Sequence, residues 1–353
     1  MASIYLARAT NRSGEFFDYP RQRIVDSQNT DAYGSHRITE CPDEADVILF
    51  ATNHFYEPVG LGILGEMTFR RHFRKCVVFN SDDNPSPIFG GLCAAWPRSD
   101  TRPGLASGWC YFHPNAAEAT LVRQAWPNQP QYLWSFCGSK TTHPIRERLM
   151  EIQDPEALCD DTSRRSLPNL YGIVSAAEHE QFVNKYVSVM ASSAFVVCPR
   201  GRSASSMRIF EAMRLGRAPV IIADDWSPPP FVDWERCSVR VPEKEIDRLP
   251  ELLRHHRAQA QVLGDRANEE WNRVFGPPGL FHHTVEACLE LIKARPNNFN
   301  LQMFKRCGKL VQPPWRRFFL RWLARRAGVS PSLSGWFARH KDGLNNAAKL
   351  NSH

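Results

Sequence analysis

Three arginines and two serines within a short polar stretch have the types and spacing that could bind an anion. Arg200, Arg202 and Arg208 carry full positive charges, and Ser205 and Ser206 stand between them with hydroxyl groups. A guanidinium matches a phosphate in bidentate geometry better than an ammonium does. The stretch therefore predicts a site for a diphosphate.

Glu211 adds a carboxylate to this group. It follows Arg208 by three residues, so the two side chains share one face of a helix. A carboxylate one turn beyond a diphosphate site is placed to accept both hydroxyls of a ribose, which predicts a nucleotide ligand. The alternative is an ordinary ion pair between Arg208 and Glu211 at the surface.

The elements around these residues are predicted to form a βαβ unit. Ser205 or Ser206 is expected to cap the helix, and Gly216 to end it. The expected strand, loop, helix and second strand cover residues 195–198, 200–206, 207–215 and 218–223. The two strands of such a unit are parallel, and ligands of open α/β sheets bind at the carboxyl ends of the strands. The arginine-bearing loop lies at such an end.

The same stretch resembles the nucleotide-sugar-binding region of the exostosin glycosyltransferases, family 47. That family shows a Pro-Arg-Gly loop, a Ser-x-Arg-x-x-Glu helix start, a Pro-Val strand and then Trp, Pro-Phe and Trp. The matching residues are Pro199, Arg200, Gly201, Ser206, Arg208, Glu211, Pro219, Val220, Trp226, Pro230, Phe231 and Trp234. The resemblance covers roughly residues 132–275.

This resemblance implies an α/β protein with the GT-B fold, in which two Rossmann-like domains face a central cleft. It implies inverting transfer of a sugar from a nucleotide-diphosphate donor, with a UDP-sugar favoured, and neither a cofactor nor a metal. Arg200 and Arg208 would neutralise the departing diphosphate, and Glu211 would hold the ribose. Asp224 and Asp225 are a carboxylate pair, but adjacent side chains on an extended segment point to opposite faces, which disfavours chelation.

A second polar loop, residues 138–144, precedes an expected helix at 145–152 with Pro144 at its first position. The loop does not have the spacing of a Walker A motif, which disfavours ATP hydrolysis. Lys140 and Arg146 are either helpers at the donor diphosphate or solvated surface charges.

The catalytic base is expected to come from the first domain. Strands are expected at residues 4–7, 47–51 and 77–80, and an acidic loop follows the last of them. Asp82 and Asp83 are the first candidates to take a proton from the acceptor hydroxyl. His54 is the second candidate and His113 the third. The alternatives are an Asx turn before proline for the aspartates and a packed side chain for either histidine.

The chain is expected to contain three parts: an acceptor domain at 1–128, a nucleotide-sugar-binding domain at 129–296 and a basic helical tail at 297–353. From residue 301 onward, eleven Lys and Arg face one acid, so the tail carries +10 while the whole chain nets +7. The tail is expected either to lie on an anionic membrane surface or to pack against the first domain. Because the basic excess is confined to the tail, nucleic-acid binding is disfavoured.

The first residues show no basic-then-apolar leader, and no apolar run reaches the length of a membrane span. We therefore expect a cytoplasmic protein, peripheral at the inner face of the membrane where the tail attaches. The acceptor would be a polysaccharide or a lipid-linked glycan. Two alternatives stay open: a fucosyltransferase that uses GDP-fucose, and a nucleotide-sugar-binding protein without catalysis.

Overall fold

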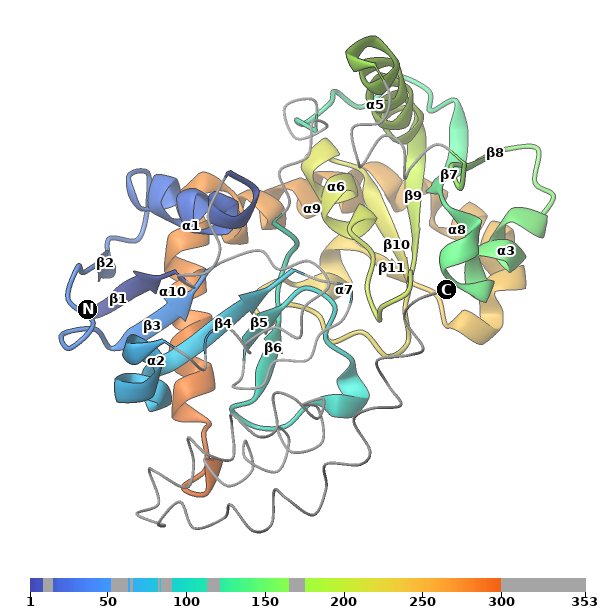
Figure 1. The fold of residues 1–353 in the computed structure, drawn as a ribbon. Coiled ribbons are helices and arrows are strands. Elements are labelled where there is room, and N and C mark those ends of the chain that lie inside the picture. Colours follow the sequence, from blue (N-terminus) through green and yellow to red (C-terminus); the bar gives the residue numbers. More distant parts are fainter. Residues whose placement is uncertain are drawn as a thin grey trace. The chain divides into compact units, whose positions relative to one another are not determined.

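The structure is a computed structural model of the chain, and it describes residues 1–8, 15–51, 63, 66–81, 83, 91–112, 121–164 and 175–299. Residues Met1–Pro296 form one compact unit, and Asn297–His353 form a second. The first unit contains two separate parallel sheets (Figure 1).

The first sheet has six strands in the order β2-β1-β3-β4-β5-β6, and every neighbouring pair is parallel. Its strands are β1 (Ala2–Ala7), β2 (His36–Ile38), β3 (Val47–Phe50), β4 (Cys76–Asn80), β5 (Gly91–Cys93) and β6 (Ala106–Gly108). The central strands β3 and β4 are buried along their whole length, as expected for a parallel sheet covered on both faces.

The second sheet has five strands in the order β11-β10-β9-β7-β8, again all parallel. Its strands are β7 (Tyr132–Gly138), β8 (Ala157–Asp161), β9 (Ser193–Pro199), β10 (Ala218–Ile222) and β11 (Val239–Arg240). β9 and β10 consist almost entirely of apolar residues and are fully buried.

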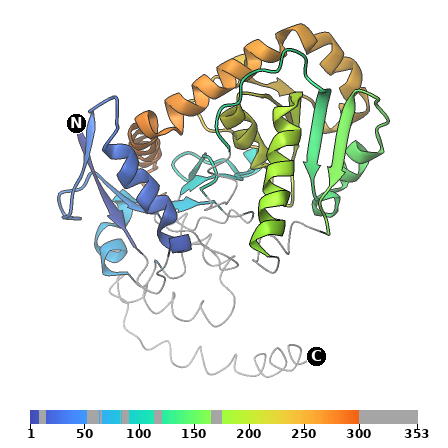
Figure 2. The same cartoon turned by 90° about the horizontal axis from the view of Figure 1, so that it is seen from above.

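The described helices are α1 (Glu15–Gln28), α2 (Met67–His72), α3 (Pro144–Glu151), α5 (Ala176–Ala191), α6 (Arg208–Leu215), α7 (Trp234–Cys237), α8 (Leu249–His256), α9 (Ala260–Val274) and α10 (Pro277–Lys293). α5 packs on β7 and β9 (Figure 2), and α6 packs on β9 and β10. α6 ends at Gly216, whose φ of 73° places it in the left-handed region, as the sequence predicts.

α10 leaves the second sheet and packs against α1, β3, β5 and β6 of the first (Figure 1). The Ser27 hydroxyl on α1 donates to the Pro277 carbonyl at 2.7 Å. The boundaries proposed from the sequence place α10 in the second domain, but besides α9 it contacts α1 and strands of the first sheet. A helix that returns to the first domain was expected in the basic tail, which from residue 300 onward lies outside the described residues.

One hydrophobic core continues from the first sheet into the second. It includes Ile4 and Val77 from the first sheet and Phe210 and Trp234 from the second part of the chain. Trp226, fully buried, donates its indole N–H to the Ala94 carbonyl at 3.3 Å. The motif tryptophans therefore contribute to packing between the two sheets.

The expected α/β fold with two Rossmann-like sheets is confirmed by this topology. The strands expected at 4–7, 47–51, 77–80, 195–198 and 218–223 are present as β1, β3, β4, β9 and β10. Residues 97–107 lead through a short 3-10 turn into the edge strand β6. Among the described residues, no helix has the length and apolar character needed to cross a membrane.

Candidate functional site

In the second sheet, the order in which the chain adds strands reverses between β7 and β9. From β7 the chain goes to β8 on one side, and from β8 it crosses to β9 on the other side of β7. The loops after β7 and β9 therefore start at neighbouring strand ends and run to opposite sides. Such a switch point leaves a crevice at the carboxyl ends of the two strands, where ligands of open α/β sheets bind. The arginine-bearing loop 200–206 follows β9, and the loop 139–143 follows β7.

Arg146, on α3, joins these two loops. It is buried, and its guanidinium donates to the carbonyls of Arg200 at 2.9 Å, Pro199 at 3.1 Å and Ser139 at 3.2 Å. Burial, together with repulsion from Arg208, lowers the pKa of Arg146 to about 9. The sequence left this residue open between helper and surface charge, and the structure shows a buried clamp.

Arg208 begins α6 and lies beside the same strand ends. Its Nε donates to the Cys137 carbonyl at the end of β7, and its guanidinium lies over the Phe136 ring at 5.1 Å and the Tyr186 ring at 5.8 Å. A Cβ at Gly138 would come within 2.4 Å of the Arg208 guanidinium, so the glycine makes room for this side chain. Two positive side chains thus come together at the switch point.

Glu211 is buried one turn further along α6, so it is not part of a surface ion pair. Its carboxylate accepts a hydrogen bond from the Tyr186 hydroxyl of α5. Burial raises the pKa of Glu211, and the nearby Arg208 opposes that rise. Burial also raises the pKa of Tyr186, which keeps its proton and acts as the donor.

Neither serine caps α6, which corrects the expectation for Ser205 and Ser206. The N-cap position is Met207, and it makes no side-chain cap hydrogen bond. The Ser206 carbonyl already accepts from the Ile209 N–H, so the chain turns into the helix through its backbone. Both serines are buried, and the Ser206 hydroxyl has no hydrogen-bond partner among the described residues. A buried hydroxyl of this kind is available to a ligand.

Asp83, in the loop that follows β4, is brought to the β9–α6 loop. It is exposed, and it accepts a hydrogen bond from the Ser203 hydroxyl at 3.1 Å. Tyr111 lies in the same group. Burial, with a contribution from the Asp83 carboxylate, raises the pKa of Tyr111. The first and second sheets thus both supply residues here.

The remaining predicted donor residues lie further out. Arg200 is half-buried, and its guanidinium lies 3.9 Å from the Glu243 carboxylate. Arg202 is exposed. Lys140 is also exposed, and its ammonium pairs with Asp161 at 3.5 Å. Of the predicted donor residues, Glu211, Ser205 and Ser206 are buried, and Arg208 is half-buried.

Asp82, His54, His113 and the basic tail from residue 300 onward lie outside the described residues. The neighbouring Asp224 and Asp225 are both engaged in hydrogen bonds. Asp225 accepts from the Ser99 hydroxyl and N–H, each at 2.8 Å, and Asp224 accepts from the Glu243 N–H at 3.2 Å. Their carboxylates therefore stabilise the loops that contain Ser99 and Glu243.

Sequence reasoning missed Tyr186 and Tyr111. The available signal was the hydroxyl itself, because a buried tyrosine usually finds a hydrogen-bond partner. Ser203 was passed over for the two serines that follow it, although it is the one that contacts Asp83.

Two cavities bear on function. One of 320 Å³ lies at the carboxyl ends of β1 and β3, the switch point of the first sheet, and its lining includes Arg8, Arg21, Glu66 and Thr68. A larger one of 710 Å³ lies between α1, α9 and α10 and reaches Arg214 at the far end of α6. The larger cavity is therefore remote from the loops after β7 and β9.

Comparison with known proteins finds one family. Residues 96–256 match the Exostosin GT47 domain. Exostosin-1 of Drosophila melanogaster is 25% identical over 192 residues, which are 51% of this chain and 25% of that protein. Exostosin-2 of Bos taurus is 30% identical over 198 residues, 53% of this chain and 26% of that protein. The chain thus spans about a quarter of the length of these exostosins.

A plant relative matches a shorter piece. The probable glucuronoxylan glucuronosyltransferase IRX7 of Arabidopsis thaliana is 39% identical over 72 residues, 20% of this chain and 16% of that protein. The predicted resemblance to the exostosins is confirmed, as distant homology. The matched domain begins at residue 96, earlier than the 132 expected from the motifs, so it includes the end of the first sheet.

Solved structures of nucleotide-sugar glycosyltransferases also match, at low similarity. HepE of Anabaena in complex with UDP is 12% identical, with a TM-score of 0.42, and the match covers 81% of this chain and 99% of that one. TarM of S. aureus is 9% identical, with a TM-score of 0.37, and covers 70% of this chain and 54% of that one. These scores are too low to support an argument about function.

Proposed function

We propose that this chain, whose residues 96–256 form an exostosin GT47 domain, is an inverting glycosyltransferase that takes its sugar from a nucleotide-diphosphate donor, with UDP favoured. The observation that carries the proposal is the pair Arg146 and Arg208 at the switch point of the second sheet. Two guanidiniums are brought together there at the edge of a buried site, and one lowers the pKa of the other.

An anion offsets the repulsion between these two arginines. In the proposed complex, Arg208 and the Ser206 hydroxyl bind the donor diphosphate and neutralise the charge that develops as the sugar leaves. Arg146 holds the two loops in place, because its guanidinium is committed to their carbonyls. Arg200 would contribute charge from the rim, and Ser205 would assist from within the loop.

Glu211 would bind the ribose. It stands one turn beyond Arg208 on α6, and the Tyr186 hydroxyl fixes the position of its carboxylate. A carboxylate can accept from the two vicinal hydroxyls of a ribose at once. The buried carboxylate beside the arginine pair thus supports a nucleotide rather than a free phosphate as ligand.

The acceptor would enter from the first sheet. The cavity of 320 Å³ lies at the switch point of that sheet, and its polar lining suits a sugar. Asp83 is the proposed base, and the hydrogen bond that its carboxylate accepts from the Ser203 hydroxyl supports this role. A polysaccharide or a lipid-linked glycan is the proposed acceptor, and the basic tail is the proposed contact with an anionic membrane.

Calorimetric titration with UDP, GDP and dTDP, in the presence of chelator, tests this function. The wild-type chain should bind one nucleotide, and Arg208→Ala should weaken that binding tenfold or more, because a charge-assisted contact contributes roughly 1.5 to 3 kcal/mol. Arg236→Ala is the matched control, since Arg236 is an exposed arginine of α7 whose nearest carboxylate is Asp233.

Each result separates the alternatives. Preference for GDP would favour a fucosyltransferase, and nucleotide binding without turnover of any donor would favour a binding protein. Equal affinity in wild type and Arg208→Ala, with both folded, would contradict the assignment of Arg208. Binding that requires added metal would contradict a metal-independent site.

A further inference from the structure

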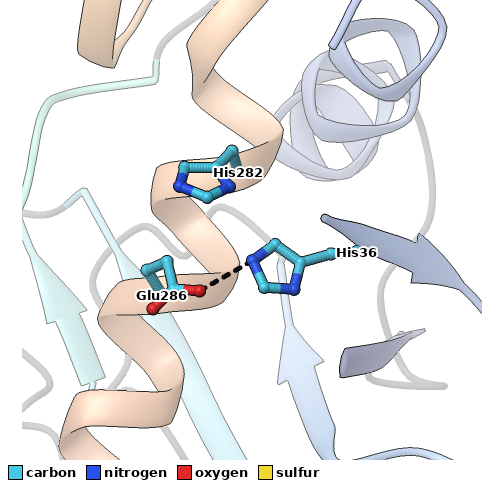
Figure 3. A group of neighbouring side chains, drawn as sticks. All are labelled: His36, His282 and Glu286. Carbon is cyan, nitrogen blue, oxygen red and sulfur yellow. Dashed lines mark ion pairs between the residues drawn. The ribbon is translucent and has the colours of Figure 1, made fainter. Parts of the chain in front are cut away.

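Two histidines and a glutamate converge on the first sheet, away from the loops discussed above. His36 is the first residue of β2, and His282 and Glu286 lie on α10 (Figure 3). His282 and Glu286 are four residues apart, so they share one face of the helix. One ligand atom from each of the three side chains lies within 4.8 Å of the other two. Within the described part of the chain, no other trio of histidine, cysteine or acidic side chains meets in this way.

The backbone that carries these side chains is held in place. The Phe281 N–H donates to the Ser27 hydroxyl at 2.9 Å, and the Ala32 N–H donates to the Pro278 carbonyl at 2.9 Å. These bonds tie α10 to the end of α1 and to the segment that leads into β2. His36 itself is fixed by the pairing of β2 with β1. The three side chains therefore meet on a preorganised scaffold.

Burial and unpaired polar atoms show that this cluster has nitrogen and oxygen atoms to offer a ligand. The His36 side chain is only 5% exposed. The Tyr33 ring stacks on the His282 ring, with centroids 3.9 Å apart and an angle of 8° between the planes. Nevertheless, His282 Nδ1 is buried and has no hydrogen-bond partner among the described residues, and the same is true of the nearby Asp31 Oδ1. Buried polar atoms without partners are rare in folded proteins, and a bound ion would provide a partner for such atoms.

We propose that His36, His282 and Glu286 bind one divalent transition-metal ion, for which zinc is the best fit. Two imidazole nitrogens and one carboxylate oxygen form a ligand set that zinc accepts, with water in the fourth position. The two imidazole ligands disfavour magnesium and calcium, which prefer oxygen ligands.

Binding would require small adjustments. Ligand atoms around a tetrahedral zinc lie about 3.4 Å apart, given metal–ligand distances of about 2.0 to 2.2 Å. His36 Nε2 and the Glu286 carboxylate now lie 2.8 Å apart, so these two atoms would move apart. The other distances between ligand atoms, which are at most 4.8 Å, would shorten. The ring proton of His36 would move to Nδ1, which now faces the Ala2 N–H at 3.4 Å, and this weak contact would be lost. We therefore expect micromolar rather than nanomolar affinity.

The proposed ion would join the edge strand β2 to α10, which are distant in the sequence. It would stabilise the return of α10 onto the first sheet. It takes no part in sugar transfer, because the donor loops follow β7 and β9 of the other sheet, so this proposal does not depend on the proposed function.

The test uses the full chain after treatment with EDTA and dialysis. Titration with zinc chloride should give one site per chain, and zinc should raise the melting temperature in a way that EDTA reverses. His282→Ala and Glu286→Gln should each weaken zinc binding at least tenfold. The amide in Glu286→Gln can still bond to His36, so this variant should fold like wild type without metal. The double variant His255→Ala/His256→Ala removes an adjacent histidine pair on α8 and should leave zinc binding unchanged.

Cobalt distinguishes this site from the cysteines of the chain. Bound cobalt should show the visible bands of a tetrahedral nitrogen and oxygen site without a thiolate charge-transfer band. A strong thiolate band, an unchanged zinc affinity in both Glu286→Gln and His282→Ala, or no zinc binding in wild type would overturn the proposal.

Discussion

Asp83 is exposed, yet a single hydrogen bond from the Ser203 hydroxyl ties it to the donor loop. That bond is what distinguishes it from an ordinary loop aspartate before proline. A base must lie within reach of the acceptor hydroxyl and be oriented there. In the proposed role of Asp83 as the base, the hydrogen bond from Ser203 would orient its carboxylate.

Asp83→Asn should reduce turnover by roughly 10²- to 10⁴-fold while leaving nucleotide affinity unchanged, because general base catalysis contributes on that order. The amide keeps the bond to Ser203, so the loop should stay in place. The assay is release of nucleotide diphosphate from the donor that calorimetry identifies, with an acceptor present. Ser203→Ala is the companion variant and should have a smaller effect. Undiminished turnover in Asp83→Asn would rule Asp83 out as the base.

At the level of residues, the sequence pointed to the group that we propose binds an anion, but not to how its members are held in place. Arg208 and Glu211 could be found because the spacing of an arginine and a glutamate on one helix face is visible in the chain. The role of Arg146 could not, because its partners are backbone carbonyls of Ser139, Pro199 and Arg200, which no residue type reveals. The role of Tyr186 could not be predicted either, because the residue type does not reveal that its buried hydroxyl donates a hydrogen bond to Glu211.

Helix α3 positions the Arg146 clamp, and its start depends on His143. This residue is the N-cap, and its Nδ1 accepts from the Ile145 N–H at 3.2 Å. Pro144 follows at the first helical position, as the sequence predicts. An accepting Nδ1 must be unprotonated. Burial, followed by repulsion from Arg200, lowers the pKa of His143, which is consistent with this role.

This cap should make the stability of the chain depend on pH. A histidine whose folded pKa lies below its unfolded value, about 6.5, contributes stability at neutral pH and loses it as the pH falls below that value. His143→Ala should lower the free energy of unfolding by about 1 kcal/mol at pH 7 and by less at pH 5. Urea denaturation at both pH values measures the difference. His255→Ala, which alters an exposed histidine of α8, is the control. An equal loss at both pH values would contradict the role of the neutral ring.

Elements with strong patterns were predictable, and short ones were not. β9 and β10 each stand out in the sequence as an apolar run. The end of α6 stands out because Gly216 follows a segment with helical periodicity. β5 and β6 have three residues each and pair only within the folded sheet, so no periodicity marks them. The start of α6 was assigned to a serine because serines favour caps, but the backbone turn through Met207 made such a cap unnecessary.

At the scale of the whole described unit, the two sheets share one hydrophobic core, so we expect them to unfold together. Trp226 lies where they meet. It is fully buried, its indole N–H bonds to Ala94 of the first part, and its ring contacts Trp234 at 5.1 Å between centroids. Pro97 and Trp226 also form an isolated antiparallel bridge.

Trp226→Ala should therefore lower the free energy of unfolding by about 3 to 5 kcal/mol, because it removes a large buried ring from this shared core and leaves a cavity. Urea denaturation followed by far-UV and by near-UV circular dichroism should give coincident transitions in both wild type and variant. Val262→Ala, at a half-exposed position of α9, should change stability by no more than about 0.5 kcal/mol. Two separate transitions in the wild type, or a loss below about 1 kcal/mol in Trp226→Ala, would show that the sheets are stable independently. In that case the aromatic half of the exostosin-like motif would need an explanation other than packing.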